Sequence, residues 1–75
     1  MTDIHAPWRR LRREAQKKGL GIPQYPRFTE KRGTRIRYYV PVSGRGDSAA
    51  WIPVAKELGY AILWDGDDVV LEVEA

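Results

Sequence analysis

The chain has 75 residues, no cysteine and a formal net charge of +3. A chain this short buries only about 60% of its unfolded surface, so we expect residues 1–75 to form a single domain. The lack of cysteine excludes disulfides and thiolate metal sites. No apolar run approaches the roughly 18 residues of a membrane span, and the charged N-terminal stretch is unlike a secretory signal. We therefore expect a cytoplasmic protein without a membrane partner.

The charge is distributed unevenly along the chain. Residues 1–46 carry twelve Lys and Arg against three carboxylates, a net +9, whereas residues 47–75 carry one Lys against seven carboxylates, a net −6. Nine of the twelve cations are Arg, whose planar fork suits phosphate and carboxylate groups alike. This asymmetry predicts an anionic partner or a head-to-tail pairing between molecules.

The first predicted element is a helix over about residues 7–18. Pro7 suits a first helical turn, Gly19 is a natural stop, and residues 1–6 should form a flexible tail. Helical periodicity separates an apolar face, comprising Trp8, Leu11 and Ala15, from a cationic face comprising Arg9, Arg13 and Lys17 with Arg10 beside them. Residues 19–26 contain two glycines and two prolines, which predicts a linker inside the domain that lies on the core.

The next predicted elements are strands. A short edge strand is expected over Arg27–Glu30, with a turn at residues 31–33. The clearest strand covers residues 34–42, and Pro41 ends it or places it at an edge. Its alternation predicts a core side with Ile36, Tyr38, Val40 and Val42 and an opposite side with Arg35, Arg37 and Tyr39.

A loop over residues 43–48 should supply Asp47 or Ser48 as the N-cap of a second helix that ends at Gly59. Two further strands, 60–64 and 69–74, flank the hairpin signal at residues 65–68. The predicted fold class is α+β: a basic N-terminal helix followed by a β-α-β-β unit. In that unit, one helix packs on a small mixed or antiparallel sheet, and a right-handed crossover returns the chain beside strand 34–42.

Two cationic segments combine into a candidate nucleic-acid site. Guanidinium and ammonium groups neutralise phosphates, and an exposed aromatic ring between arginines stacks on an unpaired base. The predicted site comprises Arg9, Arg10, Arg13, Lys17, Lys31, Arg32, Arg35, Arg37 and Tyr39. The alternative interpretation assigns no binding role to these residues: runs of charge are commonly solvent-exposed faces, and Tyr38 and Tyr39 are residues that favour β-strands.

The other motifs in the sequence do not identify a function. Residues 54–60 resemble the first helix and turn of a helix-turn-helix, but strand is predicted where a recognition helix would begin. The aspartates of residues 65–68 lack EF-hand spacing, so no metal or other cofactor is expected. The only histidine is His5, and no nucleophile, acid-base pair or phosphate loop is evident, so we expect no enzyme.

Two functional hypotheses follow from the residues. The first is a small, non-catalytic nucleic-acid-binding protein, DNA or RNA, acting as an accessory or regulator. The alternative is a protein-binding regulator or inhibitor that docks through its basic face, or through its acidic C-terminal hairpin, on a charged partner protein. Independently, the apolar last strand, Val69–Val73, predicts a homodimer through an unpaired edge.

Overall fold

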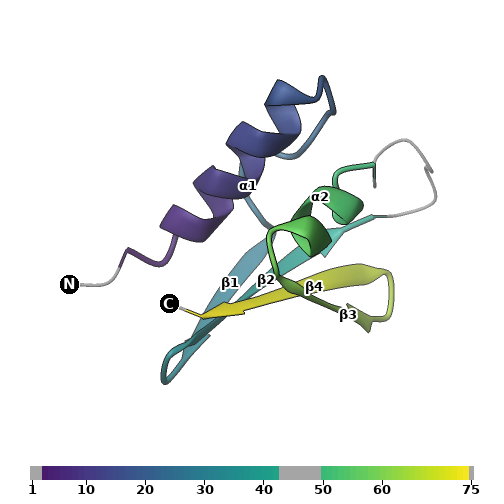
Figure 1. The fold of residues 1–75 in the computed structure, drawn as a ribbon. Helices are drawn as coiled ribbons and strands as arrows, with labels where there is room; N and C mark the ends of the chain where they lie inside the picture. Colours follow the sequence, from purple (N-terminus) through teal and green to yellow (C-terminus); the bar gives the residue numbers. More distant parts are fainter. Residues whose placement is uncertain (1–2, 43–49, 75) are drawn as a thin grey trace.

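The computed structural model describes residues 3–42 and 50–74 and shows an α+β fold (Figure 1). The elements are α1 (Ala6–Lys17), β1 (Phe28–Arg32), β2 (Arg35–Pro41), α2 (Ile52–Glu57), β3 (Ala61–Asp65) and β4 (Asp68–Glu74). This order confirms the predicted basic helix followed by a β-α-β-β unit. Among the described residues, no helix is long and apolar enough to cross a membrane.

The four strands form one sheet in the order β1-β2-β4-β3, and every neighbouring pair is antiparallel. Both helices lie on the same face of this sheet (Figure 1). The prediction that the crossover returns beside β2 is wrong, because β4 lies between β2 and β3. The β3–β4 hairpin places β4 in the central position, where it pairs with β2 along its whole length and where Val69, Val70 and Leu71 are all buried.

The core lies between the helices and the sheet and is organised around Trp8. Its ring centroid is 5.5 Å from that of Tyr38 on β2 and 6.1 Å from that of Trp51, which precedes α2. Its indole Nε1 donates a hydrogen bond to the carbonyl oxygen of Gln24 at 2.9 Å, in the linker between α1 and β1. One side chain therefore connects both helices, the sheet and the linker.

Burial confirms the faces predicted from periodicity. On α1 the buried residues are Trp8, Leu11 and Ala15, and on β2 they are Ile36, Tyr38 and Val40. Leu20 and Ile22 of the linker are partly buried against this core, as expected.

The element boundaries that differ most from prediction are the end of β1 and the start of α2. β1 extends to Arg32, so the first hairpin turns at Gly33 and Thr34; Gly33 has a φ of +59°, a conformation that favours glycine. α2 begins at Ile52 after Trp51, with no side-chain cap and with Pro53 in its first turn. The predicted N-cap at Asp47 or Ser48 is therefore wrong, because proline sets a later start. Residues 43–49, including the predicted loop, lie outside the described residues.

The predicted dimer edge is also wrong. β4 pairs with β2 on one side and β3 on the other, so Val69–Val73 offers no free edge. The apolar residues on both of its faces have another cause. Val69 and Leu71 lie in the core, while Val70 is buried on the opposite face of the sheet by its neighbours.

The packing of α1 predicts a large stability difference between its two faces. Leu11 is fully buried, and Leu11→Ala should lower the free energy of unfolding by about 2–5 kcal/mol because it leaves a cavity. Urea denaturation followed by circular dichroism measures this loss. Gln16→Ala, an exposed substitution in the same helix, is the control and should change stability by less than about 0.5 kcal/mol. Equal losses in the two variants would contradict the packing described.

Candidate nucleic-acid interface

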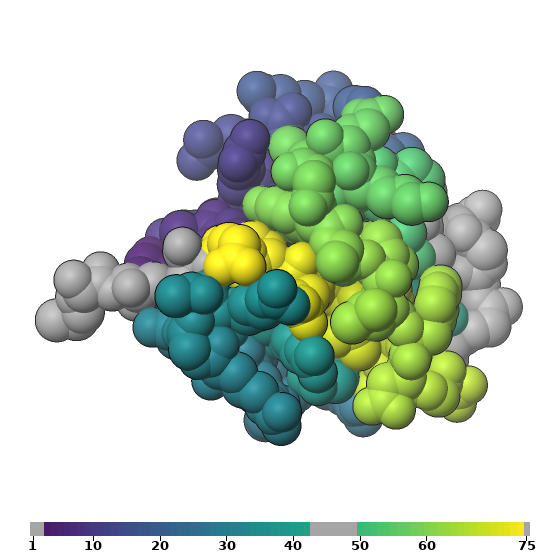
Figure 2. All heavy atoms as spheres, turned by 60° about the horizontal axis from the view of Figure 1, so that its bottom comes forward, coloured from purple at the N-terminus to yellow at the C-terminus, as the bar shows by residue number. Residues whose placement is uncertain are grey.

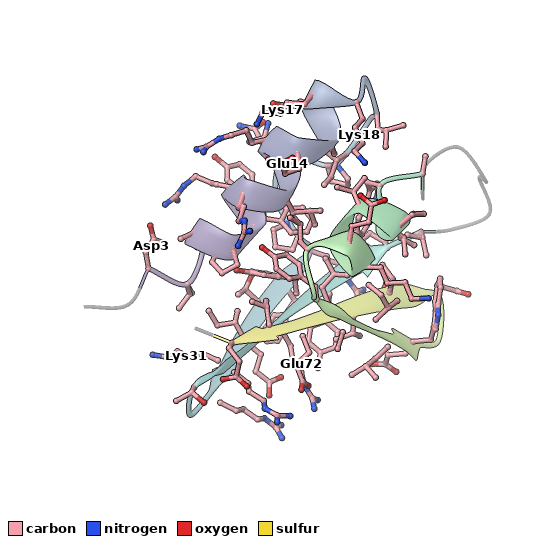
Figure 3. The ribbon with its side chains drawn as sticks, viewed as in Figure 1. Asp3, Glu14, Lys17, Lys18, Lys31 and Glu72 are labelled. Atoms are coloured by element: carbon pink, nitrogen blue, oxygen red, sulfur yellow. The ribbon has the colours of Figure 1, made fainter. Side chains whose placement is uncertain are left out.

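Eight of the nine predicted site residues lie on two different faces of the molecule, and the ninth, Lys31, lies on neither. The sheet face that points away from the helices, here called the open face, carries Arg32, Arg35, Arg37 and Tyr39. The outer side of α1, here called the cationic face of α1, carries Arg9, Arg10, Arg13 and Lys17. Lys31 alternates with Arg32 and so lies on the helix side of β1. The sheet therefore divides the residues that the sequence analysis combined (Figure 3).

On the open face, the strand register sets arginines of β2 against carboxylates of β4. Arg37 lies opposite Glu72, and Arg35 lies opposite Glu74. Arg37 Nε donates to Glu72 Oε2 at 2.8 Å, and Arg35 Nη1 donates to Glu72 Oε1 at 2.8 Å. The hydrogen bond from Arg37 holds the pKa of Glu72 below its ordinary value of 4.5 and raises the pKa of Arg37. One carboxylate thus binds both predicted phosphate ligands of β2.

The remaining arginines of the open face are paired as well. Arg32 forms an ion pair with Glu30, and Arg27 forms one with Asp68. In total, four arginines (Arg27, Arg32, Arg35 and Arg37) share this face with five carboxylates (Glu30, Asp65, Asp68, Glu72 and Glu74), a net charge of −1. β1, β2, β4 and β3 lie side by side across it (Figure 2). The open face is therefore not electropositive.

An apolar row crosses the open face. The register aligns Phe28, Tyr39, Val70 and Leu63 on successive strands. The rings of Phe28 and Tyr39 pack at a centroid distance of 5.6 Å, which leaves Tyr39 half-buried and Phe28 56% exposed. Phe28 is therefore the more accessible aromatic group, and sequence reasoning missed it because the predicted strand boundaries did not place it opposite Tyr39.

The cationic face of α1 keeps its charge. Between residues 3 and 18 there are six cations, including Arg12 and Lys18, which the predicted site omitted, against Asp3 and Glu14, a net charge of +4. Arg9 pairs with Asp3, Lys17 pairs with Glu14 at 3.3 Å, and Lys18 pairs with Glu57 at 2.9 Å. Three arginines have no ion pair within the described part of the chain: Arg10, Arg12 and Arg13.

The cations of α1 also repel one another. Side chains three or four positions apart are neighbours on a helix, and like charges at these spacings destabilise it by about 0.2–0.5 kcal/mol per pair. Four such pairs occur: Arg9 with Arg12, Arg9 with Arg13, Arg10 with Arg13, and Arg13 with Lys17. Arg9 and Arg10 also lie in the first turns, where the helix dipole disfavours cations. The helix therefore carries a charge pattern that lowers its own stability.

Two buried tyrosines attach the start of α1 to the rest of the fold. Tyr38 Oη donates to the carbonyl oxygen of Ile4, and Tyr60 Oη donates to the carbonyl oxygen of Pro7 at 2.9 Å. Burial raises the pKa of both hydroxyls, that of Tyr38 to about 12. These contacts fix the orientation of α1 and leave its cationic face directed to solvent (Figure 3).

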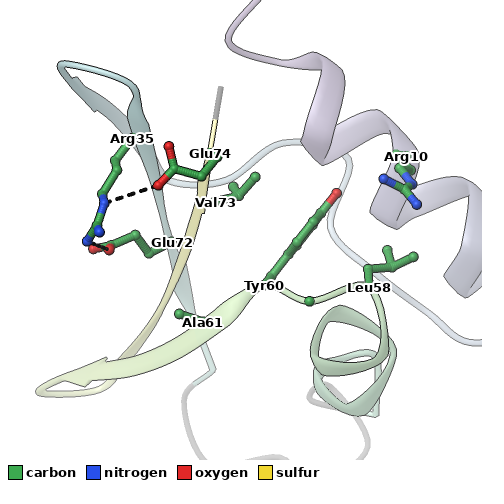
Figure 4. Close-up of a pocket in the computed structure, with 9 residues that line it drawn as sticks. Arg10, Arg35, Leu58, Tyr60, Ala61, Glu72, Val73 and Glu74 are labelled. Atoms are coloured by element: carbon green, nitrogen blue, oxygen red, sulfur yellow. Dashed lines mark hydrogen bonds and ion pairs between the residues drawn. The ribbon is translucent and has the colours of Figure 1, made fainter.

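A shallow depression of about 490 Å³ lies where α1, the end of α2 and the end of β4 meet (Figure 4). Arg10 and Arg35 both line it, so one residue from each predicted cluster comes together there. Glu72 and Glu74 line the same depression, and Arg35 Nε forms an ion pair with Glu74 at 3.3 Å. These carboxylates make the depression unfavourable for an anion.

No group of three or more metal-ligating side chains gathers within residues 3–42 and 50–74. No family model matches the chain, and neither a curated protein nor a solved structure matches it. The proposals below therefore rest on the geometry and charge of the chain's own residues.

The pairing of Glu72 predicts a pH-dependent stability difference. Its pKa is lowered by folding, so its stabilising contribution is present above the unfolded pKa of about 4.5 and is lost as pH falls through the folded pKa. Glu72→Gln should therefore lower the free energy of unfolding at pH 7. The difference from wild type in this free energy should shrink as the pH falls below 4.5 and through the folded pKa of Glu72. Urea denaturation between pH 7 and a pH below 4.5 measures this difference, with Asp67→Asn, an exposed carboxylate outside the ion pairs described, as control. A difference that is constant with pH would contradict the pairing.

The repulsion along α1 predicts a gain of stability when its central cation is removed. Arg13 has like-charged neighbours at Arg9, Arg10 and Lys17, so Arg13→Gln should raise the free energy of unfolding by about 0.6–1.5 kcal/mol at low ionic strength. The gain should fall in 1 M salt, where the Debye length is only about 3 Å. Urea denaturation at both ionic strengths measures it. Lys31→Gln, which removes one exposed charge elsewhere, should leave stability nearly unchanged; a loss in Arg13→Gln would refute the repulsion.

Proposed function

We propose that the protein is a small, non-catalytic nucleic-acid-binding protein that contacts the phosphate backbone through the cationic face of α1. The observation that carries this proposal is the separation of charge in the fold. The arginines of the open face are neutralised by carboxylates, whereas residues 3–18 keep a net charge of +4, which becomes +3 when Glu57, the ion-pair partner of Lys18, is counted. The positive charge available to an anionic partner is therefore concentrated on one helix.

The spacing of the cations suits a polyanion. Arg9, Arg13 and Lys17 recur every four residues, which places successive charges about 6 Å apart along the helix axis and gives a stripe about 12 Å long. All three are exposed. Their ion pairs with Asp3 and Glu14 are at the surface, where such pairs contribute roughly 0–1 kcal/mol, so phosphate groups compete with them readily.

The repulsion within α1 supports the same proposal. Residue patterns that destabilise a protein locally occur most often at sites that bind or react. The four like-charge pairs within the twelve residues of α1 are a destabilising pattern of this kind. A bound polyanion would neutralise all of these charges at once and would release its own condensed counterions. Binding would then remove the electrostatic repulsion that destabilises α1 in the free protein.

The alternative is a regulator that docks the same cationic face on an acidic protein. Its second form, in which the acidic hairpin docks on a basic partner, has less support, because Glu72 and Asp68 are already paired with arginines. A carboxylate polymer such as polyglutamate serves as a stand-in for an acidic protein. It carries negative charge as a nucleic acid does but has no phosphates, so comparing the two distinguishes the two kinds of partner.

Binding is tested by fluorescence anisotropy with labelled duplex and single-stranded DNA and RNA at two salt concentrations, with polyglutamate as a competitor. Wild type should bind nucleic acid, and polyglutamate should compete weakly. The variant Arg10→Gln/Arg13→Gln/Lys17→Gln should bind at least tenfold more weakly. If all three cations contact duplex phosphates, the plot of log association constant against log salt concentration should be less steep for this variant than for wild type, by about 2.7.

The matched control removes the same charge from elsewhere. Lys31→Gln/Arg32→Gln/Lys56→Gln also lowers the net charge by three, and all three residues are exposed outside α1. This control should keep most of the wild-type affinity, and both variants should stay folded by circular dichroism. Equal losses in the two variants would show a dependence on net charge alone. Stronger binding to polyglutamate than to any nucleic acid would favour the acidic protein partner.

A further inference from the structure

β3 is an edge strand whose outer side no other strand of the described chain covers. It carries two large apolar side chains that are exposed on opposite faces of the sheet: Leu63, 42% exposed on the open face, and Trp64, 62% exposed on the helix side. Its only charged residue is Asp65, at the strand end. An unpaired edge of this composition is a template for another strand.

The opposite edge of the sheet has a different composition. β1 contains Glu30, Lys31 and Arg32 within five residues, and Lys31 points toward the helix side of the sheet. Charged residues on an edge strand, and inward-pointing ones above all, are the usual protection against edge-to-edge pairing. β1 is therefore protected and β3 is not, which identifies β3 as the edge suited to association.

We propose that two copies of the chain pair through their β3 strands, antiparallel and centred on Leu63, to form a homodimer with one continuous eight-stranded sheet. Full overlap of the five-residue strands requires this register. It sets Leu63 against Leu63 of the second copy, Trp64 against Ile62, and Asp65 against Ala61.

This register is self-complementary, as a two-fold interface requires. The exposed indole of Trp64 gains an apolar neighbour in Ile62 of the second copy, and no like charges face each other directly. On the open face, the apolar row that ends at Leu63 continues into the same row of the second copy. The strand pairing also satisfies backbone groups of β3 that face outward in the single chain.

The dimer goes beyond the proposed function and does not depend on it. A two-fold axis perpendicular to the joined sheet places the helices of both copies on the same side, so each dimer presents two cationic faces of α1. Two such faces linked in one particle would increase the avidity for a long polyanion. A failure of the dimer would leave binding by a single α1 untouched.

The association is tested by sedimentation velocity on the full chain, from about 1 to about 200 µM, because an edge-strand interface is at the small end of the known range. Wild type should reach twice the single-chain mass of 8.6 kDa. Leu63→Lys sets two ammonium groups against each other and should sediment as one chain throughout. The matched control, Phe28→Lys, makes the same kind of change on β1 of the same face and should remain dimeric.

A cysteine tests the register. The chain has no natural cysteine, and directly opposed residues of an antiparallel pair lie about 4.5–5.5 Å apart between Cα atoms, within disulfide range. Leu63→Cys should therefore form a disulfide-linked dimer on mild oxidation, whereas Phe28→Cys should not. A monomeric wild type at every concentration would overturn the proposal. So would dissociation caused by Phe28→Lys, or a Leu63→Cys protein that does not cross-link.

Discussion

The antiparallel register between β2 and β4 is the constraint on which the rest of this structure depends. It places Tyr38 and Val40 opposite Leu71 and Val69 on the helix side, where all four are buried. The same register places Arg37 opposite Glu72 on the open face. A slip of one residue would turn Val69, Leu71 and Val73 of β4 away from the helices, so the core and the ion pairs are specified together.

This register also determines how charge is distributed over the surface of the folded protein. The chain divides into a basic first part and an acidic last part, and the sheet brings the two together on the open face. What remains is the charge of α1, on which Arg9, Arg10 and Arg13 are exposed to solvent and Arg12 lies half-buried at the flank. The large asymmetry in the sequence thus becomes a nearly neutral sheet face and one cationic helix. The proposal of nucleic-acid binding rests on that residual charge and on the repulsion that α1 carries without a partner.

Much of the fold follows from local pattern, whereas the composition of the site does not. The faces of α1 and β2 are predicted by periods of 3.6 and 2, and the second hairpin by Asp65-Gly66-Asp67-Asp68. The strand order is not predictable in this way, because local pattern does not show whether β3 or β4 lies next to β2. Arg37 and Glu72 are 35 positions apart, so their pairing, and the division of the predicted site into two faces, follows only from that order. Arg12 was missed because it lies at the flank of the helical stripe.

The central claim is that α1, and not the arginines of β2, presents the available positive charge. Nuclear magnetic resonance of the labelled protein during titration with a DNA duplex tests this claim most directly, because it reports on each backbone amide. The account predicts that the largest chemical-shift changes occur over residues 9–18 and that those of β2 and β4 stay small. Dominant changes at Arg35, Arg37 and Glu72 would contradict it, because they would require the ion pairs of the open face to open for the ligand.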